Sequence, residues 1–346
     1  MKKNDFTLLI GGEAGQGLVT LGQLLAKSLV HAGYSILVTQ SYQSRIRGGH
    51  NTFAIRVSTE TVVAPRESVD LLIAMNAETV TLHAAEVADG GLIVADDTHG
   101  TDTNGCLQVP YQQLAETRFA NVVALGVVSV LLGLEQALVA RALDHFFGKK
   151  DHELAEKNRQ VLTGAFDWCG QQTVTFEKLP PVAKPVRRMV MNGNEAIAMG
   201  ALSAGVKFCS FYPMTPGTSI ALNLAAHAGR MGLVVEQAED EIAAINMAIG
   251  ASFAGVPTIV PTSGGGFALM TEGVSLAGMT ETPVLIVVAQ RPGPATGLPT
   301  RTEQADLDLV LYAGHGEFPR AIFSPGTVEE CFWLARKSVE VAAKFQ

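Results

Sequence analysis

The chain is poor in cysteine: it has only four, and no two of them form a C-x-x-C pair. They are Cys106, Cys169, Cys209 and Cys331. An iron–sulfur cluster or a structural zinc ion needs several thiolate or imidazole ligands close together, so the sequence argues against such a site on this chain alone. Dispersed thiols are instead typical of a reduced, cytoplasmic protein.

Charge and long apolar runs are also scarce. Charged residues make up 17% of the chain and the formal net charge is −8, which argues against a nucleic-acid partner because nucleic-acid-binding surfaces are basic. No apolar run reaches the roughly 18 residues that a membrane helix needs. The run within Met1–Ile10 follows two lysines but is too short for a signal peptide. We therefore expect a cytoplasmic protein with no membrane partner.

The chain does have apolar residues (47%) and 35 glycines, which fall at the ends of apolar runs. Its 346 residues suffice for two domains. Strand and helix signals alternate in both halves, which predicts two doubly wound, mainly parallel α/β domains. A stretch rich in proline and basic residues at Val174–Arg188 separates them. We expect a first, Rossmann-like domain over residues 1–175, a linker over 176–189 and a second domain over 190–346.

Individual elements follow from periodicity. Leucines at 18, 21, 25 and 29 share one helix face after a strand at Phe6–Ile10, and Val69–Met75 is an almost continuous apolar run. Further strands are expected over 34–39, 70–74, 91–95, 208–212, 258–261 and 284–289, and one beginning at 234. Further helices are expected over 193–204, 219–231 and 240–253.

The first glycine-rich segment, Gly11–Gly17, lies between a predicted strand and a predicted helix. Gly12, Gly15 and Gly17 could leave backbone N–H groups free to receive a phosphate at the start of the helix, or could simply form a tight turn. A Walker A loop is excluded because Leu18 follows Gly17. A nicotinamide or flavin dinucleotide site is disfavoured because Gln40 stands where an acidic residue is expected.

A second polar segment, Ser41–Asn51, follows the next predicted strand. Arg45 and Arg47 stand beside a glycine pair and could clamp a phosphate or a carboxylate. The alternative is a solvated loop whose arginines form ion pairs.

Four segments of the second half stand at successive strand ends. The first, Tyr212–Gly217, holds Thr215 between two prolines, either as a rigid turn or at the sheet edge where α/β proteins bind ligands. The second, Glu236–Glu241, precedes an apolar helix. Its acidic side chains either complement the helix dipole or place one carboxylate against a nitrogen heterocycle.

The third segment, Thr262–Phe267, contains three consecutive glycines, Gly264, Gly265 and Gly266, which leave room for a flat ligand or another backbone. The fourth, Gln290–Arg301, is too stiff and polar for a core element. Its Arg291 suits carboxylate recognition because the guanidinium fork matches two oxygens.

With these segments the chain resembles the α subunit of 2-oxoacid:ferredoxin oxidoreductases with a γ domain fused in front. The match covers essentially all residues. The segments that carry it are Gly11–Gly17, Ser41–Asn51, Tyr212–Gly217, Glu239–Gly250, Thr262–Met270 and Gln290–Asp306. The resemblance implies a γ-type first domain and a second domain that binds the pyrimidine end of thiamine diphosphate.

Residue roles follow from the same resemblance. Glu241 matches the glutamate that meets the aminopyrimidine ring, Thr215 and Arg291 match residues that hold the 2-oxoacid carboxylate, and the glycines at 264–266 belong to the cofactor site. The loops with Gly12, Gly15, Gly17, Arg45 and Arg47 look similar to ones associated with coenzyme A. Departures at Met214, Gly265 and Ala295 spare the three functional side chains.

The resemblance also implies partners, because no diphosphate–metal signature is present. A β subunit would carry the diphosphate-binding domain and share the cofactor, with Mg²⁺ and iron–sulfur clusters on partner chains and ferredoxin or a similar acceptor. The expected assembly is a homodimer of heteromers that uses 2-oxoglutarate, and the chain would be truncated at its C-terminus. The alternatives are pyruvate or another 2-oxoacid, or a non-catalytic module that binds coenzyme A or a nucleotide.

Overall fold

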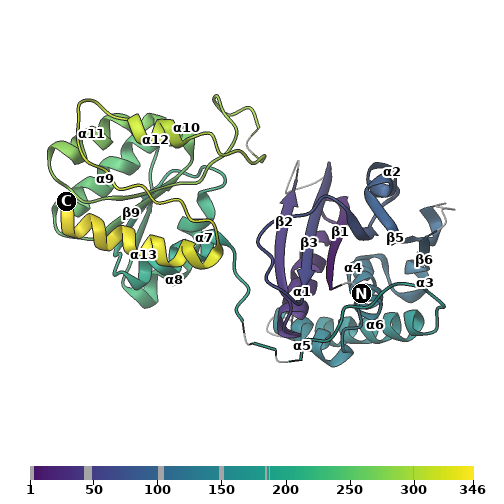
Figure 1. Cartoon of the computed structure of the whole chain (residues 1–346). Coiled ribbons are helices and arrows are strands. Elements are labelled where there is room, and N and C mark those ends of the chain that lie inside the picture. Colours follow the sequence, from purple (N-terminus) through teal and green to yellow (C-terminus); the bar gives the residue numbers. More distant parts are fainter. Residues whose placement is uncertain are drawn as a thin grey trace. The chain divides into compact units, whose positions relative to one another are not determined.

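The computed structural model describes residues 4–42, 49–99, 105–147, 152–183, 185–186, 188–298 and 300–346. The chain divides into two compact units, Met1–Val190 and Met191–Gln346. Each unit has its own sheet and its own hydrophobic core, and each is described by itself (Figure 1).

The first unit is built on a six-stranded mixed sheet with the order β2-β3-β1-β4-β5-β6. Its strands are β1 (Asp5–Glu13), β2 (Ser35–Ser41), β3 (His50–Ser58), β4 (Val69–Ala74), β5 (Val87–Asp96) and β6 (Cys106–Val109). The pairs β1–β4, β4–β5 and β5–β6 are parallel, whereas β3 runs antiparallel to both β1 and β2. The sequence pattern did not predict β3, and this strand makes the sheet mixed at one end.

The helices of the first unit are α1 (Leu18–His31), α2 (Ala77–His83), α3 (Tyr111–Leu114), α4 (Ala120–Leu132), α5 (Gln136–Phe147) and α6 (His152–Gly170), with short 3-10 turns at Ala84–Glu86, Asp97–His99 and Thr117–Phe119. Strand side chains alternate between the two faces of the sheet. Phe6, Leu8 and Ile10 join the core formed with α1, α4, α5 and α6, whereas Leu9 packs on the opposite face with Val80 of α2. The covering helices are therefore unequally divided between the two faces.

Helix α1 confirms the predicted leucine face, since leucines 18, 21, 25 and 29 are all buried. Helix α4 is apolar around most of its circumference and is buried along most of its length, between α1 and α6. A helix that is hydrophobic on every side needs such an interior position.

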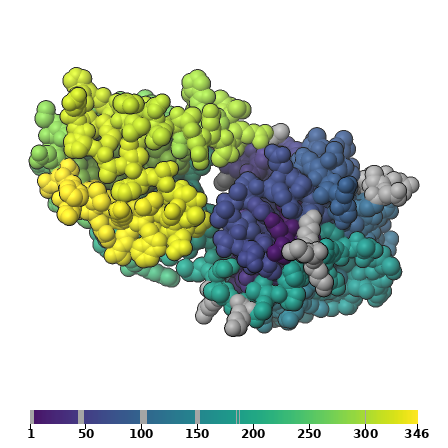
Figure 2. Space-filling model, in the orientation of Figure 1, coloured from purple at the N-terminus to yellow at the C-terminus, as the bar shows by residue number. Residues whose placement is uncertain are grey.

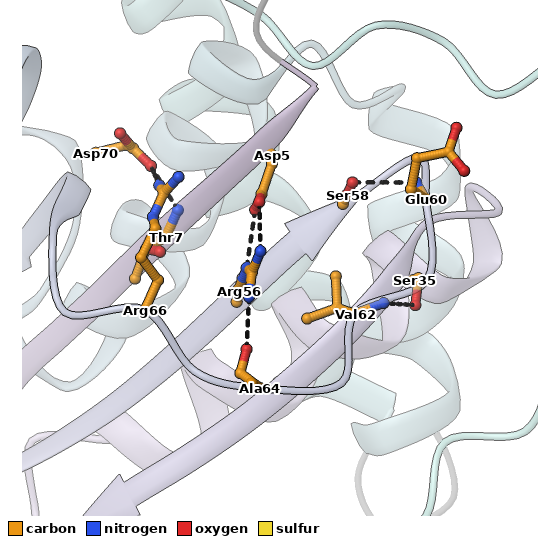
Figure 3. Close-up of polar contacts among 10 residues, drawn as sticks. All are labelled: Asp5, Thr7, Ser35, Arg56, Ser58, Glu60, Val62, Ala64, Arg66 and Asp70. Atoms are coloured by element: carbon orange, nitrogen blue, oxygen red, sulfur yellow. Dashed lines mark hydrogen bonds and ion pairs between the residues drawn. The ribbon is translucent and has the colours of Figure 1, made fainter.

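The segment that joins β3 to β4 is fixed by two acidic side chains (Figure 3). Asp70 is 2% exposed, accepts the Thr7 N–H at 2.7 Å and also pairs with Arg66. Asp5 pairs with Arg56 at 2.6 Å, and Arg56 donates to the Ala64 carbonyl at 2.8 Å. The start of β4 is thereby joined to β1 through a side chain in place of a ladder hydrogen bond.

Part of the expected linker over 176–189 packs against the first unit. Leu179 is buried in the first unit, Phe176 and Val182 pack beside it, and the Tyr34 hydroxyl donates to the Pro180 carbonyl at 3.0 Å. The first compact unit accordingly extends to Val190, beyond the expected end at residue 175.

The second unit has a four-stranded sheet, parallel throughout, with the order β10-β9-β7-β8. Its strands are β7 (Phe208–Phe211), β8 (Val234–Gln237), β9 (Thr258–Thr262) and β10 (Leu285–Val288). Its helices are α7 (Gly193–Ser203), α8 (Thr218–Met231), α9 (Glu241–Phe253), α10 (Gly264–Leu269), α11 (Thr271–Met279), α12 (Leu307–Tyr312) and α13 (Val328–Phe345).

Helices flank this sheet on both faces. Residues of α7, α8 and α13 pack in one core, and residues of α9, α10, α11 and α12 pack in another (Figure 1). Helix α13 is amphipathic and presents a broad outer surface, shown in yellow in Figure 2. The predicted strand at 284–289 is present as β10; its apolar sequence favours full burial, but it is half-buried because β10 is an edge strand.

Across the described residues, no helix combines the length and the apolar character that crossing a membrane requires.

Candidate functional site

Glu241 is the first residue of α9, directly after the turn that follows β8. Asp240 precedes it as the helix N-cap, and its carboxylate accepts the Ala243 N–H at 2.7 Å. Asp240 thus performs the capping that acidic residues usually supply at this position. The Glu241 side chain is free to point inward and is only 3% exposed.

The buried Glu241 carboxylate lies against the glycine turn at the start of α10. A Cβ atom built on Gly266 would lie 2.8 Å from Glu241 Oε1 and 2.2 Å from Thr262 Oγ1, so no side chain fits there without displacement. Among the described residues, Glu241 Oε1 has no hydrogen-bond partner. A buried polar atom without a partner is costly and is often found where a ligand binds.

The three predicted glycines form the first turn of a helix, not an open loop. A Cβ on Gly264 would lie 2.1 Å from Asp306 Oδ1, whereas Gly265 has nothing closer than Met214 Sδ at 4.0 Å. Gly264 and Gly266 are therefore required by close contacts, and Gly265 is not.

Thr215 and Arg291, which the sequence placed on separate strand-end loops, lie together. Arg291 is 6% exposed; its Nη1 donates to the Thr215 carbonyl at 2.9 Å and its Nη2 to Thr296 Oγ1 at 3.1 Å. The contact uses the backbone oxygen of Thr215, so the threonine hydroxyl is not engaged by Arg291.

Three further polar residues support these loops, and the sequence pattern did not single them out. Asn194 of α7 donates to the Pro216 carbonyl at 2.9 Å and to Ser219 Oγ at 2.6 Å. Gln290 Oε1 accepts the Asp306 N–H at 2.9 Å. Burial raises the pKa of the Asp306 carboxyl, and the nearby Arg291 opposes this rise. Side-chain contacts to distant backbone leave no periodic signal in a sequence.

In the part of the second unit that the structure describes, three of the buried side-chain oxygens without a partner lie around one turn. Glu241 Oε1 and Asp306 Oδ2 face Gly266 and Gly264 respectively, and Ser263, whose Oγ is also unpaired, directly precedes them. A cluster of unpartnered polar atoms of this kind suits a ligand that carries several hydrogen-bonding nitrogens.

An apolar groove of about 890 Å³ runs along the outer edge of β10, between α11, α12, residues 318–325 and α13, and Asn194, Gln290 and Asp306 are among the residues that line it. No described strand pairs with that edge of β10. Glu241, Thr215 and Arg291 do not line the groove.

In the first unit, the glycine segment is closed by Gln16. Its Oε1 accepts the Glu13 N–H at 2.7 Å and its Nε2 donates to the Met75 carbonyl at 3.3 Å. Gly15 and Gly17 adopt positive φ angles of 101° and 77°, and Gly17 is the N-cap of α1. The segment is therefore a tight turn leading into a helix. The predicted Arg45 and Arg47 lie outside the described residues.

A histidine pair lies at the same edge of the sheet, where His50 stands opposite Glu13 in the pairing of β3 with β1. His50 Nε2 and His83 Nε2 are 2.8 Å apart, and His83 Nδ1 lies 2.9 Å from Glu86 Oε1. Burial, followed by the nearby His83, lowers the pKa of His50. Within the described ranges, no three His, Cys, Asp or Glu side chains are grouped to hold a metal ion.

Comparison with known families assigns both units. Residues 7–168 match the family described as pyruvate ferredoxin/flavodoxin oxidoreductase, and residues 199–346 match the one described as pyruvate flavodoxin/ferredoxin oxidoreductase, thiamine diphosphate-binding.

Relatives and a solved structure agree over nearly the whole chain. A 2-oxoacid:ferredoxin oxidoreductase subunit alpha from Sulfolobus is 32% identical across 98% of this chain and 62% of its own length. A 2-oxoglutarate oxidoreductase subunit KorA from Mycobacterium tuberculosis is 29% identical across 99% of this chain and 59% of its own length. The structure of a 2-oxoglutarate:ferredoxin oxidoreductase from Magnetococcus marinus, with 2-oxoglutarate, coenzyme A and succinyl-CoA bound, matches 99% of this chain and 62% of its own at 32% identity and a TM-score of 0.90.

The fold and these matches define a two-domain α/β chain of the 2-oxoacid oxidoreductase class, whose second domain is of the thiamine diphosphate-binding type. The chain belongs to the 2-oxoacid:ferredoxin oxidoreductase family and resembles its alpha subunits. It spans about three-fifths of the length of the curated relatives it matches.

Proposed function

We propose that this chain is a subunit of a 2-oxoacid:ferredoxin oxidoreductase and that it holds the pyrimidine end of thiamine diphosphate at Glu241. The observation that carries the proposal is the buried Glu241 carboxylate, whose Oε1 has no partner among the described residues and faces Gly266, where a Cβ atom would not fit without displacement. That arrangement suits a flat, nitrogen-rich ring, because the carboxylate can exchange a proton with a ring nitrogen that replaces its missing partner.

Each residue around the turn has a defined task in this proposal. Bound there, thiamine diphosphate supplies the carbanion and electron-sink chemistry that decarboxylation of a 2-oxoacid requires. Glu241 holds a proton at Oε1 and sets the protonation state of the ring that it contacts. Gly264, Gly265 and Gly266 keep side chains away from the ring, and the apolar α9 helix behind Glu241 excludes water from the carboxylate.

Thr215 and Arg291 are proposed to bind the carboxylate of the 2-oxoacid. Arg291 uses one N–H donor for Thr215 and one for Thr296. A guanidinium has more than two such donors, so others remain for a substrate oxygen. The side chain is nearly buried, and charge-assisted hydrogen bonds in such surroundings contribute about 1.5–3 kcal/mol each. The Thr215 hydroxyl adds a neutral donor beside it.

The first unit is proposed to meet coenzyme A as the acyl acceptor, through Gly12 near the end of β1 and the turn with Gly15 and Gly17 that leads into α1. Support comes from the start of α1, where Gly17 caps the helix without a side chain, and from the Magnetococcus relative, whose structure contains coenzyme A. Arg45 and Arg47 belong to the proposal by sequence alone.

The complete reaction is proposed to be oxidative decarboxylation of a 2-oxoacid to an acyl-CoA, with 2-oxoglutarate favoured because relatives carry that substrate in their names. A β chain would bind the diphosphate with Mg²⁺, iron–sulfur clusters on partner chains would pass electrons to ferredoxin, and two such heteromers would form the assembly. This chain would then be inactive alone.

The test is reduction of viologen that depends on both 2-oxoacid and coenzyme A, by the chain purified with its β partner. Glu241→Gln removes the ionisable group with little change in shape and is expected to lower kcat by roughly 10²–10⁴-fold. Glu239→Gln, at an exposed residue two positions earlier, is the matched control and should retain activity. Near wild-type turnover by Glu241→Gln would remove the proposed role, and coenzyme A binding without turnover would favour a non-catalytic module.

A further inference from the structure

The segment Tyr212–Gly217 joins β7 to α8 and contains neither helix nor strand, so contacts with other elements must fix its backbone. We call it the Thr215 loop. Two adjacent carbonyls of this loop are each held by a different side chain. Arg291 Nη1 donates to the Thr215 carbonyl at 2.9 Å, and Asn194 Nδ2 donates to the Pro216 carbonyl at 2.9 Å. The loop is thus held from the β10 side and from α7.

Helix α8 follows the Thr215 loop directly and has no side-chain cap of its own, because its N-cap is Gly217. Asn194 supplies a contact from outside, since the same Nδ2 also donates to Ser219 Oγ in the first turn of α8 at 2.6 Å. Gly217 lies against β9, where an added Cβ would be 2.6 Å from the Thr262 carbonyl oxygen. The end of the loop is therefore fixed by α7 and β9 as well as by the helix that it enters.

The Asn194 side chain is not needed by the helix on which it lies. Asn192 is the N-cap of α7: its side chain accepts the Glu195 N–H at 3.0 Å, and its own N–H donates to Glu195 Oε2 at 2.8 Å. This reciprocal cap is complete without Asn194. Asparagine within a helix is less favourable than alanine or leucine. Asn194 therefore has a task outside α7, and its hydrogen bonds place that task at the Thr215 loop.

We propose that Asn194 is a positioning residue for the 2-oxoacid site: by fixing the backbone of the Thr215 loop it sets where the Thr215 hydroxyl and the carbonyl bound by Arg291 lie. The inference rests on the proposed function, in which Thr215 and Arg291 bind the 2-oxoacid. Asn194 does not itself contact the substrate in this proposal. A side-chain amide has two N–H groups, and Asn194 uses them on Pro216 and Ser219.

The first test needs no cofactor or partner chain. Asn194→Asp keeps the shape of the side chain but replaces the donor with an acceptor, which cannot bond the Pro216 carbonyl. Hydrogen–deuterium exchange on the full chain should show the Thr218 and Ile220 amides, which donate within the loop and the first turn of α8, exchanging about threefold to tenfold faster, as the loss of one hydrogen bond predicts.

Asn192→Asp is the matched control for this test. It makes the same substitution two residues earlier, where the N-cap needs only an acceptor for the Glu195 N–H. Exchange of the Thr218 and Ile220 amides should therefore stay at the wild-type rate. Equal exchange in Asn194→Asp and Asn192→Asp would overturn the proposed role of Asn194.

The second test uses the assembled enzyme. Asn194→Asp should raise KM for the 2-oxoacid by about threefold to tenfold. KM for coenzyme A should stay unchanged, because its proposed contacts lie in the first unit, and Asn192→Asp should change neither value. If Asn194→Asp folds poorly, Asn194→Leu has the same branched shape without the donor and replaces it. An unchanged KM for the 2-oxoacid in a folded variant, or an equal rise in both KM values, would overturn the inference.

Variants of the two proposed substrate ligands separate the inference from the function on which it rests. If Thr215→Val and Arg291→Met both leave KM for the 2-oxoacid unchanged, the proposed substrate role fails. If they raise KM but Asn194→Asp does not, the positioning role alone fails. Asn194→Leu combined with Thr215→Val should raise KM by less than the product of the single effects, because residues that act through a shared contact are not additive. Effects that simply multiply would show that Asn194 acts elsewhere.

Discussion

Gly266 and Glu241 lie so close that a single added methyl group would come within 2.8 Å of the carboxylate oxygen Oε1. Gly266 is in α10 and Glu241 is in α9, so the two residues are more than ten positions apart in the sequence. Their contact places a buried carboxylate against a position that carries no side chain, which fits the planar ligand proposed above.

Gly266→Ala should therefore abolish 2-oxoacid-dependent activity of the assembled enzyme. The new methyl group would meet Thr262 Oγ1 at 2.2 Å as well as Glu241, and overpacking of this kind costs about 1–3 kcal/mol. Gly265→Ala is the matched control, because its Cβ finds only Met214 Sδ at 4.0 Å. Activity and thermal unfolding of the two variants provide the check, and equal behaviour of both would contradict the close contact.

His50 and His83 should separate at acidic pH. Their Nε2 atoms are 2.8 Å apart, so one ring must donate and the other accept, and two imidazolium rings would both be donors. Burial and His83 hold the pKa of His50 below its usual 6.5. The stability linked to His50 is therefore complete above pH 6.5, and it is lost as the pH falls through the lowered pKa.

The histidine titrations of the folded chain, followed by NMR, would measure this. His50→Gln should flatten the acid limb of the stability curve, whereas His227→Gln, outside the pair, should leave it unchanged. An His50 titration at or above 6.5 would show that the pair does not form in solution.

The sequence predicted best where periodicity is strong and local. The leucine face of α1 and the helix that begins at Glu241 were located within one or two residues, because each presents a continuous apolar face. Strand β3 was missed although Phe53, Ile55 and Val57 alternate, because the neighbouring arginines and glycines were interpreted as a ligand loop. Its antiparallel direction is set by the fold and leaves no mark in the strand itself.

The site was predictable only in part. Thr215, Arg291 and the 264–266 glycines were proposed from their places after strands, but Gln290 and Asn194 bond to backbone groups far along the chain. Likewise, the apolar sequence of β10 does not show how many strands lie beside it. Because β10 is at the edge of its sheet, it is half-buried, which its sequence did not predict.

Asp70 should contribute strongly to the stability of the first unit. Asp70→Leu leaves the Thr7 N–H and Arg66 without their acceptor in a buried place, which costs about 1–3 kcal/mol for the lost hydrogen bond. Asp70→Asn keeps an acceptor for Thr7 and should cost less. Denaturant unfolding of these variants beside Asp89→Asn, an exposed control, would measure the difference, and equal midpoints for all three would contradict the role of Asp70.

Alkaline pH should destabilise the second unit through Cys209. The thiol is fully buried in β7, and burial raises its pKa to about 12 from an ordinary value of 9.0. The folded state therefore keeps its proton where the unfolded state releases it. The stability linked to this group is complete below pH 9, and it falls as the pH rises towards 12.

Cys209→Ala removes the ionisable thiol and should weaken the fall in unfolding free energy between pH 9 and 11, at the cost of a small cavity. Cys106→Ala, whose thiol is more accessible in the first unit, is the matched comparison. Iodoacetamide gives an independent readout: at pH 8 the folded chain should leave Cys209 unmodified until urea exposes it. Rapid labelling of Cys209 without denaturant would mean that β7 opens readily, and the buried sheet beneath the Glu241 site would then be less rigid than its packing indicates.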